Sequence, residues 1–291
     1  MNNCEKCNVC SNPGTFDRAS ESKAVYSNVR EFKQEKFTVW RCSACNSIHS
    51  REAVDLKSYY QNYLVNKSTL NYFVKSSYYG RLRFLQKCGL KKQHQILDYG
   101  CNQGLFVSFL TQLGFIHAAG YDPYIVQHSG TEVLAQKYDF ITAYDVLEHV
   151  DRPQEILSRL TNLLKPDGIL VIGTPNAEEV SLANPESLEL HQPFHRHIVS
   201  ARVLHSMAQQ AGVKIVKFNR RWYLDTIYPF VNARFVLTYV RKSGNYLDVL
   251  VEPPNWKILL VNPQLIFYGF CGYFLRWQGN MTVAMQKSKC K

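Results

Sequence analysis

The most regular hydrophobic pattern in the chain is a short apolar strand, a polar loop, an apolar helix and a second short strand. Ile96 and Leu97 lead into Asp98, and a glycine-containing loop follows. Residues 105–113 are apolar at helical spacing, and Ala118 to Tyr121 leads into Asp122. Short buried strands that alternate with helices predict an α/β fold with a parallel sheet.

The loop after the first strand has the composition of a nucleotide-binding turn. Gly100 and Gly104 let the backbone approach a ligand closely, and the helix N-terminus faces the same place. Asp122 follows about 20 residues after the loop, a spacing that suits a carboxylate holding two ribose hydroxyls. The alternative is a helix cap and a turn without a ligand. The order of strand, loop, helix, strand and acid favours the nucleotide site.

Two CxxC pairs near the N-terminus predict a structural zinc site. Cys7 and Cys10 form the first pair, and Cys42 and Cys45 form the second. Two such turns provide the four thiolates of a tetrahedral ion, and the alternating segment 37–41 predicts a strand of a zinc ribbon. A redox pair or a chance cluster is the alternative. Cys4 begins a third overlapping pair and is an alternative ligand to Cys7.

Several motifs resemble class I S-adenosylmethionine-dependent methyltransferases of the ubiquinone-biosynthesis-like subgroup. The loop D-Y-G-C-N-Q-G, residues 98–104, resembles motif I of that family. Further similar segments are D-V-L-E-H at 145–149, L-L-K-P-D-G at 163–168, T-P-N at 174–176 and H-R-H-I-V-S at 195–200. The resemblance covers roughly residues 93–221, with a last strand at Met281–Gln286. A zinc ribbon before such a domain is also similar to sugar C-methyltransferases.

The resemblance implies a Rossmann-like sheet, the cofactor S-adenosylmethionine and a set of cofactor-binding residues. The loop would wrap the methionine portion, Asp122 would take the ribose, and the residues after the fourth strand would line the sulfonium side. The implied set is Asp98, Tyr99, Gly100, Cys101, Asn102, Gly104, Asp122, Pro123, Tyr124, Asp145, Val146 and Leu147.

Two departures from the family pattern bear on this site. Asn102 replaces the middle glycine of motif I, and asparagine is the least costly substitute where the backbone is left-handed. Only 15 residues, 123–137, separate Asp122 from the next strand. That length is too short for a helix, a third strand and another helix. We therefore expect a sheet abridged at the third-strand edge; whether this weakens the cofactor site is left open.

Methyl transfer to a hydroxyl or an acidic carbon requires a general base, and histidine is the usual choice near neutral pH. His191, His195 and His197 lie close together after the fifth strand and are the candidate catalytic residues. Sugar C-methylation would need a base beside a carbonyl, for which His191 or His195 is the candidate. His149 fits a positional role better.

Residues 222–277 form an insertion between the sixth strand, 213–221, and the last one. It contains 14 aromatic residues in 56. Asn262 and Pro263 predict the start of a helix that runs to about Trp277 and is apolar on nearly every side. Such a helix packs in a lid over the acceptor, in a dimer contact, or on a membrane surface through 258–277. Nearby basic residues suggest a diphosphate clamp: Arg220, Arg221, Arg234, Arg241 and Lys242.

These features divide the chain into a zinc ribbon (1–50), a helical connector (51–92), a methyltransferase domain (93–221 and 278–291) and the insertion. A tyrosine of the connector is a candidate cover for the cofactor. With 46% hydrophobic residues, the chain is not a disordered one. The polar N-terminus does not resemble a signal peptide, which predicts a cytoplasmic protein, with membrane attachment as an alternative.

The net charge of +11 is unevenly distributed. Residues 1–95 carry +9, residues 96–200 carry −8 and residues 201–291 carry +10. An acidic centre between basic flanks favours a small-molecule or glycan-type acceptor, for example a nucleotide-linked or lipid-linked sugar. Two alternatives are an RNA methyltransferase that grips RNA through the ribbon and flanks, and a scaffold without activity. The acceptor and the oligomeric state are left open.

Overall fold

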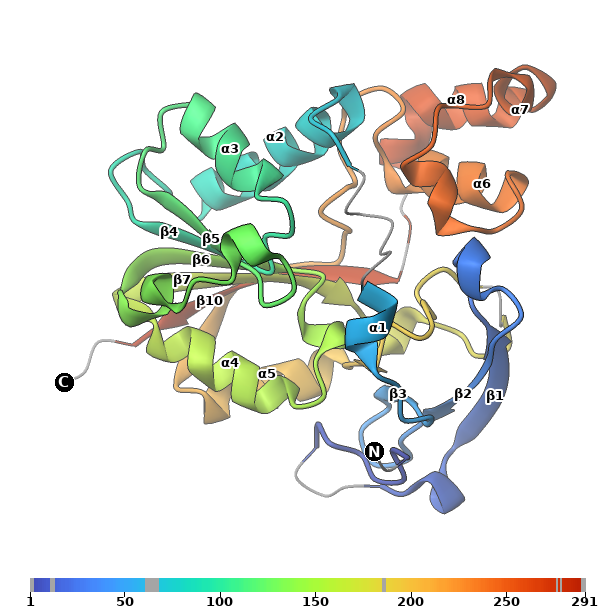
Figure 1. Ribbon diagram of the computed structural model, residues 1–291, viewed down its shortest axis with the longest axis horizontal. Coiled ribbons are helices and arrows are strands. Elements are labelled where there is room, and N and C mark those ends of the chain that lie inside the picture. Colours follow the sequence, from blue (N-terminus) through green and yellow to red (C-terminus); the bar gives the residue numbers. More distant parts are fainter. Residues whose placement is uncertain are drawn as a thin grey trace.

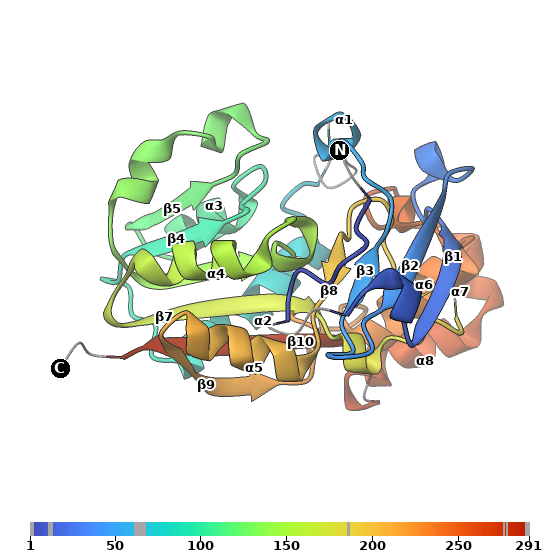
Figure 2. The same ribbon diagram turned by 90° about the horizontal axis from the view of Figure 1, so that it is seen from below.

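The computed structural model describes residues 3–10, 14–60, 68–184, 187–275, 277 and 279–288. A six-stranded sheet with helices on both faces forms one part of the molecule (Figure 1). A four-stranded antiparallel sheet and a group of helices lie beside it, as the view from below also shows (Figure 2). In the described part of the chain, no helix combines the length and the apolar character needed to cross a membrane.

The six-stranded sheet has the order β5-β4-β6-β7-β10-β9. The first four strands are parallel, and β10 runs antiparallel to both of its neighbours. This mixed sheet confirms the predicted Rossmann-like arrangement with an antiparallel last strand. The strands are β4 (Ile96–Tyr99), β5 (Ala118–Tyr121), β6 (Tyr138–Tyr144), β7 (Leu164–Pro175), β9 (Val213–Asn219) and β10 (Asn280–Lys287).

Alternate residues of the central strands face two separate cores. Ile96, Phe140 and Val171 pack against the helices α2 (Tyr72–Lys87) and α3 (Leu105–Gln112). Their neighbours Leu97 and Ile141 face the opposite side, against α4 (Pro153–Asn162) and α5 (Ala201–Gln210). Because successive strand residues point to opposite faces, helices on both sides require strands that are apolar throughout.

The sheet ends at β5, as the short segment after Asp122 predicted. Residues 123–137 contain two 3₁₀ turns, η4 (Val126–His128) and η5 (Thr131–Ala135), and no strand beyond β5. The main chain of Asp122 donates to the His128 carbonyl at 2.9 Å, and the His128 ring reaches the motif I loop, where a Cβ on Gly104 would lie 2.5 Å from His128 Nε2. The cofactor-side edge is thus closed by turns instead of a third strand.

The N-terminal region forms the antiparallel sheet β1 (Glu21–Tyr26), β2 (Lys36–Arg41), β3 (Ile48–Ser50) and β8 (His197–Ile198). The strand predicted at 37–41 is β2. The fourth strand, β8, comes from the histidine-rich segment, with Ile48 opposite Ile198. The core of this sheet also includes Ala177, Val180 and Leu182. The N-terminal region is therefore not free-standing, since residues 177–198 complete both its sheet and its core.

The connector contains two helices, α1 (Leu56–Tyr60) and α2. Residues 61–67 between them, which include the connector residue Tyr63, lie outside the described part. Three further 3₁₀ turns are η1 (Phe16–Arg18), η2 (Arg30–Phe32) and η7 (Ala177–Glu179), and η6 (Leu147–His149) follows β6.

The insertion contains α6 (Ala233–Lys242), η8 (Leu247–Leu250), α7 (Trp256–Val261), α8 (Pro263–Cys271) and η9 (Gly272–Phe274). The predicted helix does start at Pro263, but it ends at Cys271 and not near Trp277. The Asn262 side chain does not cap it; its Nδ2 donates instead to the Ile258 carbonyl at 2.8 Å. α8 is buried on one side only, because Leu265 and Gly269 face α6 while Phe267 and Phe270 are exposed.

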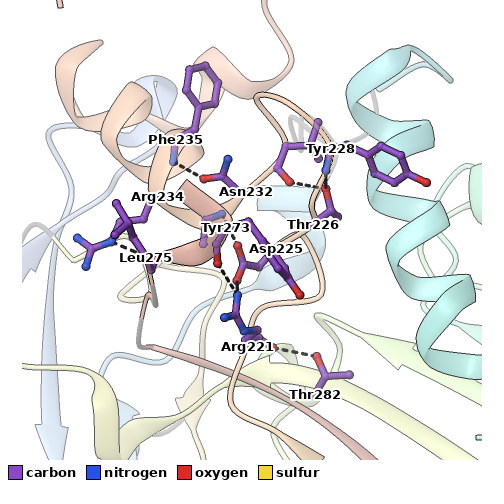
Figure 3. A network of polar contacts seen from close by, with 12 residues as sticks. Arg221, Asp225, Thr226, Tyr228, Asn232, Arg234, Phe235, Tyr273, Leu275 and Thr282 are labelled. Atoms are coloured by element: carbon purple, nitrogen blue, oxygen red, sulfur yellow. Dashed lines mark hydrogen bonds and ion pairs between the residues drawn. The ribbon is translucent and has the colours of Figure 1, made fainter. Parts of the chain in front are cut away.

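Three of the basic residues predicted to clamp a diphosphate contact residues of the insertion, and Figure 3 shows two of them, Arg221 and Arg234. Arg221 pairs with Asp225 at 2.6 Å and also donates to the Tyr273 carbonyl. Arg234 and Arg241 lie over the ring of Trp277 at 5.0 and 4.9 Å. Arg220 lies 3.8 Å from Glu179. None of these arginines lines the cavities described below, so the cavities give the clamp hypothesis no support.

Candidate functional site

Two adjoining cavities lie at the carboxyl ends of β4, β5 and β6. The first, of about 380 Å³, is lined by residues that directly follow these strands, among them Gly100, Asp122 and Asp145. The second, of about 270 Å³, lies between the histidine-rich segment and the insertion. Both are lined by Tyr78, Arg81, Cys101, Asn102, Asp145 and His149. Ligands of open α/β sheets bind at this edge.

Ten of the twelve predicted cofactor-binding residues line the first cavity. They are Asp98, Tyr99, Gly100, Cys101, Asn102, Asp122, Pro123, Tyr124, Asp145 and Val146. The other two lie behind it. Gly104 caps the N-terminus of α3, and Leu147 is 1% exposed in the core. Leu147 therefore supports the wall without lining either cavity.

The motif I loop requires its left-handed backbone. Gly100 has φ 77°, and a Cβ there would lie 2.4 Å from the Val146 side chain. Asn102 has φ 49°, which confirms that asparagine takes the left-handed place of the missing glycine. The main chain of the loop can consequently still lie close to the cavity, as the glycine of the family pattern allows.

Asp122 ties the loop to the second strand. Its Oδ2 accepts from the main chain of Asn102 at 3.0 Å, and its Oδ1 accepts from the main chain of Tyr124 at 2.9 Å. Each carboxylate oxygen has a second lone pair for a ligand hydroxyl. The carboxylate is thus held in one orientation at the wall of the cavity.

Asp98 is a buried carboxyl at the base of the first cavity, 5% exposed. Its Oδ1 accepts from the Thr142 hydroxyl at 2.6 Å. Burial raises the pKa of Asp98 to about 6, despite the opposing effects of Thr142 and Arg81. The ionised form of Asp98 therefore lowers the stability of the folded protein unless a positive charge lies next to it.

Tyr60 of α1 covers the first cavity. Its ring stacks on Tyr124 with centroids 4.5 Å apart, and its hydroxyl lies 2.7 Å from His149 Nδ1. The connector thereby contributes one aromatic side chain to the cavity wall, as the sequence suggested for this region.

Arg81 of α2 lies where the two cavities meet, and sequence reasoning missed it. Its guanidinium lies over the rings of Tyr223 and Tyr144 at 4.0 and 4.4 Å, and its Nε is buried without a hydrogen-bond partner. Tyr223, from the insertion, in turn donates to Asp145. No motif marks Arg81, because its environment is assembled from α2, β6 and the insertion.

The second cavity contains three of the chain's histidines, His149, His191 and His195. His195 Nδ1 donates to the Glu189 carbonyl at 2.7 Å, so the neutral ring has its lone pair on Nε2. Burial lowers the pKa of His195 to about 4, which keeps the ring neutral at pH 7. His191 Nδ1 donates to Asn28 Oδ1 at 2.5 Å, and burial also lowers its pKa.

The structure separates His197 from the other candidate bases. His197 lies in β8, opposite His49 of β3, is 1% exposed and lines neither cavity. His149 takes its place beside the cavity, with its ring 4.9 Å from that of His195. A positional role was expected for His149, because nothing in its local sequence pattern shows that it meets residues 191–195.

The N-terminal sheet holds the histidine-rich segment in place. The Ser27 hydroxyl donates to the Gln192 carbonyl at 2.8 Å, and Asn28 binds His191. Ser200 Oγ donates to the Cys45 carbonyl at 2.8 Å. The candidate bases are thus positioned by a part of the chain more than 140 residues away in sequence.

Four cysteines come together at the base of this sheet. The sulfur atoms of Cys7, Cys10, Cys42 and Cys45 all lie within 4.8 Å of one another. Cys4 is not in the group; its thiol donates to the Lys6 carbonyl. Asn46, after the second pair, has φ 62°, whereas Ser11, after the first, lies outside the described residues. This donor set and spacing fit a tetrahedral zinc ion.

Comparison with known proteins agrees with the central part of this site. Residues 74–217, just under half of the chain, match a family model described as "Methyltransferase domain". A ubiquinone biosynthesis O-methyltransferase of Glaesserella parasuis is 31% identical over 109 residues, covering 28% of this chain and 45% of that protein. Its counterpart in Coxiella burnetii is 33% identical over 117 residues, covering 33% and 50%. The chain spans about half the length of these curated relatives.

A structural comparison supports the fold. A chain of the complex between the Haloferax volcanii Trm112 methyltransferase activator and a methyltransferase has a TM-score of 0.50 to this one, at 12% identity. The superposition covers 81% of this chain and 99% of the other. Residues 74–217 are thus similar in sequence to methyltransferase domains, and the chain as a whole is similar in fold to that neighbour.

The raised pKa of Asp98 predicts a pH-dependent stability effect. Because its folded pKa of about 6 exceeds that of an unfolded aspartate, the folded state loses stability as pH rises from about 4 to 6. Asp98→Asn should therefore be more stable than the original protein at pH 7.5, by about 2–3 kcal/mol, with the difference vanishing near pH 4. Urea unfolding at several pH values measures this. A pH-independent difference would contradict it.

Proposed function

We propose that this chain is an S-adenosylmethionine-dependent methyltransferase that acts on a small-molecule acceptor. The observation that carries the proposal is the pair of cavities that meet at Arg81 and Asp145, inside a domain that matches methyltransferases. The first cavity would hold the cofactor and the second the acceptor. A methyl donor and its acceptor must meet along one line with water excluded, and two joined cavities provide that geometry.

The residues of the first cavity fit the parts of the cofactor. Asp122 would accept both ribose hydroxyls, and Tyr124 and Tyr60 would flank the adenine. Asp98 would face the methionine ammonium, whose charge offsets the cost of the buried carboxylate. Arg81 would bind the methionine carboxylate, since its Nε lacks a partner. When bound, S-adenosylmethionine supplies a methyl group on a positively charged sulfur.

Cofactor binding can be tested without knowing the acceptor. Calorimetry with S-adenosylhomocysteine should show one binding site per chain, and Asp122→Ala should weaken binding by about tenfold or more. Glu155→Ala is the matched control, because Glu155 is an exposed acid of α4 that pairs only with Arg152 in the described structure. If the original protein fails to bind at millimolar ligand, the cofactor proposal is wrong and the scaffold alternative takes its place.

In the acceptor cavity, His195 is the proposed general base. Its Nε2 would take the proton from an acceptor hydroxyl or an acidic C–H, and the electron pair left behind would attack the methyl carbon as the carbon–sulfur bond breaks. The Glu189 carbonyl fixes the tautomer that this step needs. Asn28 would orient His191 beside the same acceptor.

The histidine roles predict different kinetic effects. His195→Asn should lower kcat by about 100-fold or more with S-adenosylhomocysteine affinity intact, while His191→Asn should have a smaller effect. Because the pKa of His195 is about 4, its protonation should cause no loss of rate between pH 8 and about pH 5. His117→Asn, at an exposed histidine, is the control. Unchanged turnover in both variants would eliminate the base assignment.

A sugar or glycan-type acceptor remains our specific proposal within the small-molecule class. The N-terminal ribbon supports it through the resemblance to sugar C-methyltransferases, in which the base would act beside a carbonyl. The diphosphate clamp no longer supports a nucleotide-linked form, because its arginines pair within the insertion. RNA is the second candidate acceptor, favoured by the basic flanks. The curated relatives, by name, act in ubiquinone biosynthesis.

We also propose that the four-cysteine cluster binds a structural zinc ion. All four ligand positions would be filled by protein, so the ion would stabilise the N-terminal sheet and take no part in the reaction. Through Ser200 and Asn28, that sheet holds the segment of the candidate bases.

The zinc proposal is tested by metal analysis of the full chain. Mass spectrometry should find about one zinc per chain, which Cys42→Ser abolishes while lowering the free energy of unfolding by at least about 2 kcal/mol. Cys88→Ser should retain the metal, because Cys88 lies at the end of α2, outside the cluster. A reduced protein that neither contains zinc nor takes it up would contradict the proposal.

A further inference from the structure

Helices α7 and α8 carry a concentrated group of exposed apolar side chains. Of the 16 large apolar side chains that are exposed in the described structure, eight lie within residues 256–275. We call them the α7–α8 face: Trp256, Leu260, Val261, Ile266, Phe267, Phe270, Phe274 and Leu275. Leu260 is 77% and Phe274 76% exposed. The surfaces of soluble monomeric proteins rarely contain so many large apolar side chains close together unless they bind a partner.

The orientation of this face is fixed by packing on its other side. Leu265 is fully buried in the core of the insertion. Gly269 lies so close to the Phe230 ring that a Cβ there would be 2.4 Å from it, and the Phe230 main chain donates to the Gly269 carbonyl at 2.7 Å. α8 cannot rotate to bury Phe267 and Phe270 without losing these contacts. The packing on the buried side of α8 thus keeps its other side exposed.

The face has a cationic setting. Lys257 of α7 and Lys242 of α6 are exposed and form no ion pair within the described part of the chain. The acids of the insertion are largely neutralised, since Asp225 pairs with Arg221 and Glu252 with Arg30. The helices lie at the outer end of the molecule, away from β4 to β6 (Figures 1 and 2). An apolar surface with exposed lysines complements a boundary that combines negative charge with an apolar interior.

A groove leads from this face toward the second cavity. It has a volume of about 640 Å³, and Trp256, Leu260 and Ile266 of the α7–α8 face line one part of it. Phe73 and Leu250 line both this groove and the second cavity. A partner seated on the α7–α8 face would therefore lie at the outer end of a path to the acceptor cavity.

We propose that the α7–α8 face docks on an anionic lipid bilayer. Exposed tryptophan, phenylalanine and leucine on short helices enter the boundary between headgroups and acyl chains, and neighbouring lysines bind anionic headgroups. The helices are too short to span the bilayer, so they lie in its surface. The proposed contact segment differs from the 258–277 expected from the sequence: it begins at Trp256, and it leaves out Trp277, over whose ring Arg234 and Arg241 lie.

Vesicle co-sedimentation of the full chain tests this inference independently of activity. The protein should sediment with vesicles of phosphatidylcholine containing about 30% phosphatidylserine, more weakly with pure phosphatidylcholine, and with partial loss in about 0.5 M salt. Phe270→Glu combined with Phe274→Glu should weaken binding by about tenfold or more. Ile116→Glu is the matched control, because Ile116 is 70% exposed and lies far from α8 in sequence, before β5.

Two further measurements keep the outcomes distinct. The melting temperature of the double variant should match that of the original protein, since both rings are exposed; S-adenosylhomocysteine affinity should also be unchanged. If the original protein does not bind vesicles, or binds equally in the double variant, the proposal is wrong. If it instead forms a dimer that the double variant dissociates, the face binds a second copy of the chain and the membrane proposal is likewise overturned.

Discussion

The guanidinium of Arg81 is the point at which the separate parts of this structure meet. An arginine stays charged at any physiological pH, so its removal from water must be balanced by nearby rings and acids. Tyr223 of the insertion, Tyr144 of β6 and Tyr78 of α2 surround it, and Asp145 accepts from Tyr223. Members of this group line the place where the two cavities meet. Arg81 thus contacts the insertion through Tyr223 and also lines both cavities.

The N-terminal sheet contributes to the site through contacts between distant segments. β8 joins β3 by main-chain pairing, and polar contacts from Asn28 and Ser27 reach the segment that carries His191 and His195. A cluster of four cysteines lies at the other end of this sheet. The stability of the N-terminal sheet and the orientation of the candidate bases are consequently linked. The four clustered cysteines line neither cavity; Cys101 is the cysteine that lines both.

The insertion presents two different surfaces. Its inner side, with Trp222, Tyr223 and Leu237, lines the second cavity. Its outer side, the α7–α8 face, is apolar and exposed. Charge pairs such as Arg221 with Asp225 hold the segment together between these surfaces (Figure 3). The groove lined by Phe73 and Leu250 connects the two sides, since both residues also line the second cavity.

The sequence by itself determined the central sheet, its motif I loop and the position of most residues at the first cavity. These depend on local rules: apolar runs form buried strands, and left-handed turns need glycine or asparagine, as at Gly100 and Asn102. It also determined the absence of a third strand between residues 123 and 137, through chain length alone. The cysteine spacing likewise predicted the cluster.

The tertiary structure alone decided which polar side chains share a cavity. Arg81, Tyr223 and His149 come from segments with no common motif, and His197 turns into a sheet that local pattern could not reveal. It also decided that the arginines of the insertion pair with their own neighbours and that α8 exposes one side. Long-range packing sets these outcomes, because burial and charge balance depend on which segments meet in space and not on the order of residues along the chain.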